Sequence, residues 1–213
     1  MTKNMLQTLR SYWESLRSND DLPLRSDIDP RQIPEVLDSL FILERLGPED
    51  VRVRIAGLAL CEMMGMEVRG QSPLTFFAKD TRQRFAAMVG EVLARPMIAR
   101  LGLETVDRMG NEARVNMLLL PLRSDFGDVS RIIGCVTTPK GGFTAPLRFH
   151  IRTIDMEPIR PNTSTLPASR FGFSEPDVGF IMDGSTVIHT IAGGSETQAV
   201  RKVQSPSYLK LVD

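Results

Sequence analysis

The chain has 213 residues, of which 42% are hydrophobic and 24% charged, and its 26 Lys and Arg residues balance its 26 Asp and Glu residues. These values are typical of one folded domain with terminal extensions and exclude a largely disordered chain. Because positive charge is not in excess, we expect neither nucleic acid nor an anionic membrane surface as a partner.

Residues 5–18 are predicted to form an amphipathic helix, because apolar side chains recur at helical spacing while Arg10, Glu14 and Arg17 fall largely on the other side. This apolar face either packs on the chain's own sheet or forms a two-fold interface, and we favour a homodimer through it. The candidate interface residues are Leu6, Leu9, Trp13 and Leu16.

A short helix is predicted over residues 30–38, because Asp29 suits an N-cap and Pro30 a first helical position. Residues 40–44 and 51–55 then read as a two-stranded hairpin around a Gly-Pro turn, followed by a short apolar helix over 58–64.

The clearest helix begins at Asp80, which can act as a cap with Gln83 in capping-box position, and ends before Pro96. Three further strands are predicted at 97–107, 112–122 and 131–138, joined by turn-forming sequences such as 124–128. Beyond residue 157 come a proline-rich stretch and two candidate short strands, 178–182 and 186–191.

This order of elements predicts an α+β domain with a five-stranded antiparallel sheet, helices on one face and a long helix that crosses the sheet. Apolar side chains would then point between that helix and the sheet, where they form either a packed core, which we favour, or a pocket for a small apolar ligand. The candidate pocket residues are Met64, Phe76, Phe77, Phe85, Met88, Met117, Leu119, Ile133 and Cys135.

Several segments resemble a family of small alphaproteobacterial PAS-like proteins. The resemblance lies in Trp13-x-x-x-Arg17, Leu22-Pro23-x-Arg25-x-x-Ile28-Asp29-Pro30, Leu40-Phe41-Ile42-Leu43, Val53-Arg54-Ile55-Ala56-Gly57, Glu67-Val68-Arg69-Gly70 and the terminal Tyr208-Leu209-Lys210-Leu211-Val212-Asp213. It implies a single PAS-like domain, without an attached catalytic or DNA-binding module, in a regulatory protein.

The sequence offers no recognisable catalytic motif, so we expect a non-enzymatic protein. The two histidines, His150 and His189, stand outside triad or zinc patterns, and the Gly-Gly pairs lack the helix pattern of a phosphate loop. Cys61 and Cys135 lie among apolar neighbours and read as reduced structural thiols. We predict no metal site.

The PAS resemblance also bears on cofactors. PAS domains that form a flavin adduct carry a cysteine in an Asn-Cys-Arg-like motif after the first strands, and residues 70–82 contain no cysteine. Haem-binding PAS domains commonly supply a histidine from the long helix, and residues 80–95 contain none. Neither cofactor is therefore expected, and the identity of any ligand stays open.

We therefore expect a cytoplasmic sensor or adaptor in bacterial signalling that acts through other proteins, with a receptor for a small apolar ligand as the alternative. No apolar run reaches the ~18 residues that a membrane span needs, and no signal peptide is evident. The expected parts are a helical segment at 1–38, a PAS-like domain at 39–156 and a partly irregular extension at 157–213, whose order the sequence leaves open.

Overall fold

A computed structural model describes residues 2–18 and 21–159 of the chain. The chain divides into two units, Met1–Pro167 and Ala168–Asp213. The described residues belong to the first unit, so the predicted strands at 178–182 and 186–191, His189 and the terminal apolar segment lie outside them.

The first unit is built on one sheet of six antiparallel strands in the order β2-β1-β5-β4-β3-β6. The strands are β1 (Leu40–Arg45), β2 (Val51–Ala56), β3 (Met97–Val106), β4 (Glu112–Arg123), β5 (Val129–Val136) and β6 (Arg148–Pro158). The α+β class and the first five strands are confirmed, and a sixth strand extends the sheet past the expected domain boundary at 156.

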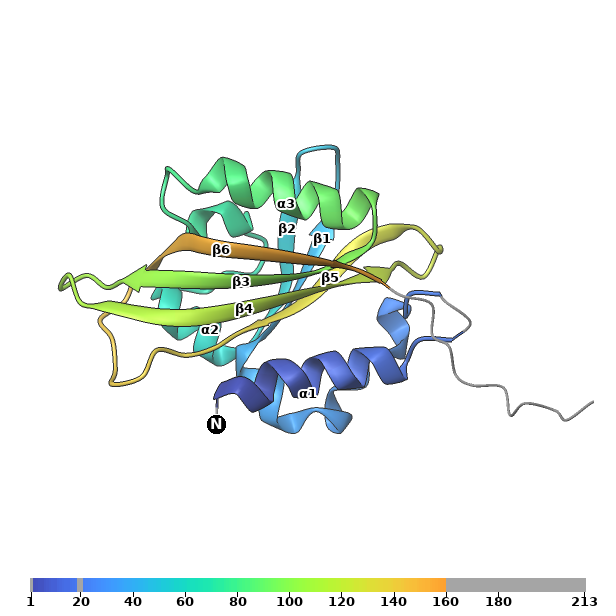
Figure 1. The fold of residues 1–213 in the computed structure, drawn as a ribbon, viewed down its shortest axis with the longest axis horizontal. Coiled ribbons are helices and arrows are strands. Elements are labelled where there is room, and N and C mark those ends of the chain that lie inside the picture. Colours follow the sequence, from blue (N-terminus) through green and yellow to red (C-terminus); the bar gives the residue numbers. More distant parts are fainter. Residues whose placement is uncertain (1, 19–20, 160–213) are drawn as a thin grey trace, which may run out of the picture. The chain divides into compact units, whose positions relative to one another are not determined.

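Helices cover both faces of this sheet (Figure 1). On the face that we call inner lie α2 (Leu58–Met64), the short 3₁₀ helix η4 (Pro73–Phe76) and the long α3 (Arg82–Ala94), over one buried apolar cluster. On the outer face, α1 (Thr2–Ser15) and the 3₁₀ helix η3 (Pro34–Ser39) cover a second cluster. The main PAS-like helices share one face as predicted, and the N-terminal helix covers the other.

One helix type and one helix start differ from the sequence prediction. Residues 30–38 form two 3₁₀ helices, η2 (Pro30–Gln32) and η3, instead of one α-helix, because the proline at position 34 has no N–H to continue the hydrogen-bond ladder. Asp29 does accept a hydrogen bond from the N–H of Arg31, at 3.0 Å. The N-cap of α3 is Thr81 instead of Asp80, without a side-chain cap bond, so the capping box does not form.

The hydroxyl of Thr81 does not cap α3 but contacts two backbone carbonyls outside the helix. It donates to the carbonyls of Ala78, at 3.1 Å, and Phe149, at 3.3 Å, and thereby ties the start of α3 to β6. Gly65 follows the last residue of α2 and adopts a left-handed conformation with φ of 69°, which is common for a glycine that ends a helix. In the described part of the chain no helix is both long and apolar enough to cross a membrane.

Candidate functional site

The first candidate site is the junction between α1 and the outer face of the sheet. Leu9 and Trp13 are fully buried there, in the cluster that includes Leu118, Leu120 and Ile133. The indole Nε1 of Trp13 donates to the carbonyl of Pro121 in β4 at 3.0 Å. This bond satisfies the one polar atom of a buried indole and fixes the position of the helix along β4.

The predicted interface residues therefore fit the alternative in which the apolar face of α1 packs on the chain's own sheet. Leu9 and Trp13 are covered by the chain's own sheet, and Leu6 and Leu16, which are half-buried, pack against the same cluster. The two buried side chains are not available to a second copy while α1 is docked. The homodimer stays a prediction, but the apolar face of α1 cannot form the dimer interface while the helix is docked on its own sheet.

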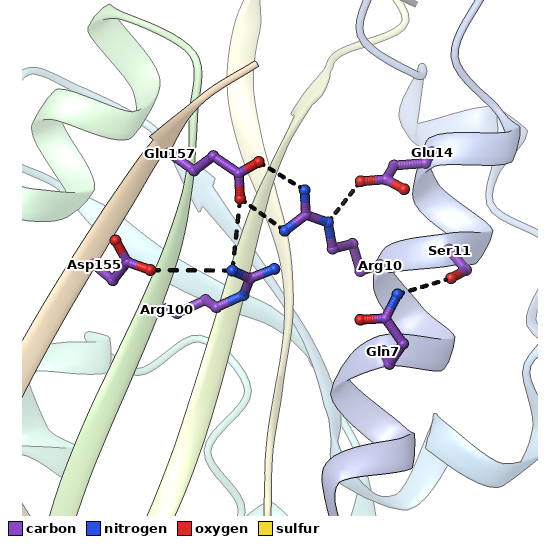
Figure 2. Close-up of polar contacts among 7 residues, drawn as sticks. All are labelled: Gln7, Arg10, Ser11, Glu14, Arg100, Asp155 and Glu157. Atoms are coloured by element: carbon purple, nitrogen blue, oxygen red, sulfur yellow. Dashed lines mark hydrogen bonds and ion pairs between the residues drawn. The ribbon is translucent and has the colours of Figure 1, made fainter. Parts of the chain in front are cut away.

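A polar cluster joins α1 to the last strand of the sheet (Figure 2). The guanidinium of Arg10 forms a two-pronged contact with Glu157 of β6, with Nη1 2.8 Å from Oε2 and Nη2 2.9 Å from Oε1. Its Nε lies 2.6 Å from Oε1 of Glu14, one turn along α1. Hydrogen bonding to Glu157 raises the pKa of Arg10 further above its ordinary value, although partial burial opposes this effect.

The cluster extends across the sheet through Arg100 of β3. Its Nη1 lies 3.5 Å from Oε2 of Glu157 and 4.0 Å from Oδ2 of Asp155 (Figure 2). Glu157 is thus shared between a helix cation and a strand cation. A bidentate arginine–carboxylate pair is directional as well as strong, so the cluster sets the angle of α1 as well as its distance from β6.

This cluster was missed by the sequence analysis. Arg10 and Glu14 are recognisable as an (i, i+4) pair on a helix, but Glu157 lies 147 positions away from Arg10 in a segment for which no strand was predicted. Only the pairing of β6 with β3 brings Glu157 beside α1. Local patterns carry no signal for such a contact.

The second candidate site is the interior between α3 and the sheet, where the pocket residues were predicted. Seven of the nine candidates lie buried in the inner cluster: Met64, Phe76, Phe77, Phe85, Met88, Met117 and Leu119. The rings of Phe77 and Phe85 stack with centroids 4.0 Å apart, and Phe149 meets Phe77 edge-on at 5.7 Å. The chain's own aromatic rings occupy this part of the interior.

The other two candidates, Ile133 and Cys135, point to the outer face. Cys135 pairs with Leu118 and Ile133 with Leu120, and residues opposite each other in an antiparallel pair share a face. Their neighbours in β5, Ile132 and Val136, face the inner cluster instead. Burial raises the pKa of the Cys135 thiol to about 12, which leaves it protonated and unreactive at neutral pH.

Outside the α1 junction, the carboxylate that accepts the most hydrogen bonds among the described residues is Asp107, after β3. Oδ1 accepts the N–H groups of Met109 and Asn111, both at 2.8 Å, and Oδ2 accepts the Asn111 amide at 2.9 Å and the Thr144 N–H at 3.0 Å. These bonds, first the one from the Asn111 side chain, lower the pKa of Asp107 to about 2. Asp107 thus ties the β3–β4 turn to the loop before β6, in a structural role.

No grouping of metal-ligand side chains occurs among residues 2–18 and 21–159. His150 lies on β6 with Nδ1 3.8 Å from Oδ2 of Asp80, an exposed carboxylate. Both cysteine thiols are free.

Comparison with known proteins identifies the fold family. Solved structures similar to this chain include the light state of the blue-light photoreceptor Aureochrome1 LOV (12% identity, 50% of this chain and 85% of that chain, TM-score 0.40). A LOV domain studied with a flavin analogue is similar at 15% identity over 52% of this chain and 84% of that chain, with a TM-score of 0.42. A Rhodobacter sphaeroides LOV protein is similar at 16% identity over 54% of this chain and 69% of that chain, with a TM-score of 0.40. No protein with a curated description matches. Residues 1–137 match the PAS domain family, and this chain therefore belongs to the PAS domain family.

Proposed function

We propose that this chain is a non-enzymatic sensor or adaptor of bacterial signalling, of the alphaproteobacterial kind that its sequence resembles, and that it acts through other proteins. Membership of the PAS family supports a sensory or signalling role. The observation that carries the proposal is the attachment of α1 to the sheet by two contacts. One is the hydrogen bond of the buried Trp13 indole, and the other is the partly exposed ion pair of Arg10 with Glu157, which we call the clamp.

The two attachments of α1 contact different strands. Trp13 is bonded to Pro121 of β4, and Arg10 is bonded to Glu157 of β6, which is separated from β4 by β3. A change in the twist of the sheet alters the distance between these two anchors. The helix must then shift or release one of them, which turns a change in the sheet into a change in the exposed surface of α1.

The clamp is suited to be the contact that breaks. The side chains of Arg10 and Glu157 are 16% and 31% exposed, so either charge can be reached by a competing group from a partner. Gln7 and Ser11, which face solvent one turn before and just after Arg10, provide an adjoining polar surface. In this proposal a signalling protein binds α1 and its polar surroundings, and the affinity depends on whether the clamp is closed.

The alternative, a receptor for an apolar ligand in the interior, has less support. A ligand in the part of the interior where Phe77 and Phe85 stack would have to displace their rings, so the open space beside α3 is limited to the groove between this helix and the β1–β2 hairpin. Native mass spectrometry of protein purified from its source distinguishes the two: a stoichiometric small molecule favours the receptor, and the bare chain mass favours the adaptor.

The proposal is tested by affinity capture from extracts of the source organism with three full-length baits: wild type, Arg10→Gln and Arg31→Gln. Arg31 is the matched control, because its side chain is 93% exposed and, among the described residues, its ion pair is with nearby Asp29. We expect a signalling protein captured in stoichiometric amount, whose affinity in a subsequent calorimetric titration changes at least about tenfold with Arg10→Gln and is unchanged with Arg31→Gln.

Two results would overturn this assignment. Equal affinity of the captured protein for wild type and Arg10→Gln would show that the clamp has no part in partner binding. Capture of no protein by any bait, together with a bound metabolite in the mass spectrum, would replace the adaptor with the receptor.

A further inference from the structure

One large apolar side chain is almost fully exposed: the ring of Phe126, at 97%, on the turn between β4 and β5. The other exposed large apolar residues in the part of the chain that the structure describes are aliphatic and less exposed, from 52% to 74%. An isolated exposed phenylalanine gains nothing from the fold of its own chain, so its burial elsewhere would be favourable.

The turn that carries Phe126 is held in a defined shape. Ser124 Oγ accepts the N–H of Phe126 at 3.2 Å and also contacts Oδ1 of Asp128, and the N–H of Gly127 bonds to the carbonyl of Ser124 at 2.9 Å. Gly127 adopts a φ of 93°, which a residue with a side chain rarely does. The ring is thus presented on an ordered turn, and its burial in a partner would cost little conformational entropy.

The same chain carries a groove of suitable chemistry, between α3 and the hairpin of β1 and β2. Its volume is about 400 Å³, within the roughly 300–1,000 Å³ of sites that bind small molecules, and more than one phenyl ring needs. Its floor is apolar and includes Phe85, Val89, Leu93, Val51 and Leu74.

One wall of the groove consists of small residues of α3. Ala86, Ala87 and Gly90 line it, all three are exposed, and an added Cβ at Gly90 would meet no atom within 4 Å. These residues permit another chain to approach the helix backbone closely.

The turn and the groove project from the same end of the sheet. The C-terminal end of β1 lies beside the N-terminal end of β5, where Nη2 of Arg45, a groove residue, donates to the carbonyl of Val129 at 3.2 Å. Since both features lie at one end, a two-fold axis there can bring each Phe126 to the groove of the other copy. Such a reciprocal arrangement is what a closed dimer requires.

One pair of opposite charges supports this approach. Asp125, next to Phe126, is exposed, and Arg84, also exposed, lies one turn before Ala87 on α3. On the hairpin side of the groove, Arg45 and Glu49 are both lining residues and their charges offset each other. We propose that two copies of this chain form a two-fold dimer in which the Phe126 ring of each copy inserts into the α3 groove of the other.

This inference deepens the proposed function, because it names a second copy as one partner and moves the predicted homodimer contact from α1 to the β4–β5 turn. The dimer can be absent while the proposed function of α1 holds, because α1 packs on the outer face of the sheet and α3 on the inner face. A monomeric chain would overturn the dimer and leave the Arg10 capture experiment unaffected.

The test is sedimentation velocity on the full chain over a concentration series, with Phe126→Ser, Ala87→Glu and the control Met109→Ser. Met109, 74% exposed, lies on the turn at the other end of β4. We expect wild type and Met109→Ser to dimerise alike, and each of the other two variants to raise the dissociation constant about 30-fold or more, as loss of an aromatic anchor does.

Mixing the two variants provides an internal check. A Phe126→Ser copy keeps an intact groove and an Ala87→Glu copy keeps an intact ring, so a mixed dimer retains one of the two contacts and should be tighter than either variant alone. A monomeric wild type, a dimer unaffected by Phe126→Ser or by Ala87→Glu, or a mixture no tighter than its components would each overturn the inference. Circular dichroism on all variants verifies that the fold is intact.

Discussion

At the scale of single residues, the interior depends on the ring of Phe85. Its side chain is 1% exposed, stacks on Phe77 and belongs to the same cluster as Phe149. Because the stack lies between α3 and β6, it joins the long helix to the last strand. The buried face of α3 carries Phe85, Met88, Val89, Val92 and Leu93, and it includes the two residues of this helix that the sequence predicted to point toward the sheet, Phe85 and Met88.

Replacing Phe85 with alanine is expected to lower the free energy of unfolding by about 3–5 kcal/mol, because the substitution removes a buried ring and leaves a cavity. Urea denaturation followed by far-UV circular dichroism measures the loss. Phe126→Ala, at a ring that is 97% exposed, is the control and should change the value by less than about 0.5 kcal/mol at concentrations where the chain is monomeric. Equal effects of the two substitutions would contradict this packing.

At the scale of elements, the sequence predicted five of the six strands and the three α-helices with small errors at their ends. What it could not supply was the face of β5. In β5 the residues from Ile132 to Val136 are all buried, so no alternation of apolar and polar residues reveals which side chains point inward. The facing of Ile133 and Cys135 follows only from the pairing register, in which Leu118 is opposite Cys135.

The polar clamp and β6 were unpredictable for a related reason. A strand at the edge of a sheet needs only one apolar face, and β6 carries Arg152, Asp155 and Glu157 among its apolar residues, which weakens the strand pattern. Its position becomes clear once β3 is placed, because β6 pairs with β3 along its whole length. The burial of the Met and Phe residues between α3 and the sheet was predictable in kind, since their spacing favours one apolar face.

The connection between the β3–β4 turn and the loop before β6 depends on the ionised form of Asp107. Its pKa of about 2 lies below that of an unfolded aspartate, so the ionised carboxylate stabilises the fold fully above about pH 4, and this contribution is lost as the pH falls toward 2. Asp107→Asn should therefore be less stable than wild type at pH 6, and the difference should narrow at pH 3. Urea denaturation at a series of pH values checks this, and a difference independent of pH would contradict it.

At the scale of the whole unit, one sheet separates two apolar clusters, and neighbouring residues of β4 belong to different ones. Leu118 lies in the outer cluster under α1, and Leu119 lies in the inner cluster under α3. Both clusters share the same backbone ladder, so the loss of either should weaken the sheet that supports the other. The unit is therefore expected to unfold as one cooperative structure.

This cooperativity can be tested with two alanine substitutions. Leu118→Ala and Leu119→Ala should each cost about 2–5 kcal/mol and shift the same single transition. Trp13, the one tryptophan, reports on the outer cluster by fluorescence, and far-UV circular dichroism reports on the sheet and helices. The two curves should superimpose for both variants and for the control Leu46→Ala, at a residue that is 52% exposed; a Trp13 transition that precedes the other in Leu118→Ala would show that α1 detaches first.

The glycine at position 134 has a consequence for engineering of this scaffold. A Cβ there would lie 2.5 Å from Cζ of Phe41 and 2.7 Å from the carbonyl oxygen of Leu118, so even alanine would displace the buried Phe41 ring and force the β4 backbone away from β5. Those three strands form the middle of the sheet, and no flexible side chain alone could absorb the clash. A saturation library would retain only glycine codons at 134, whereas Gly90 on the open side of α3 would accept a wide range of replacements.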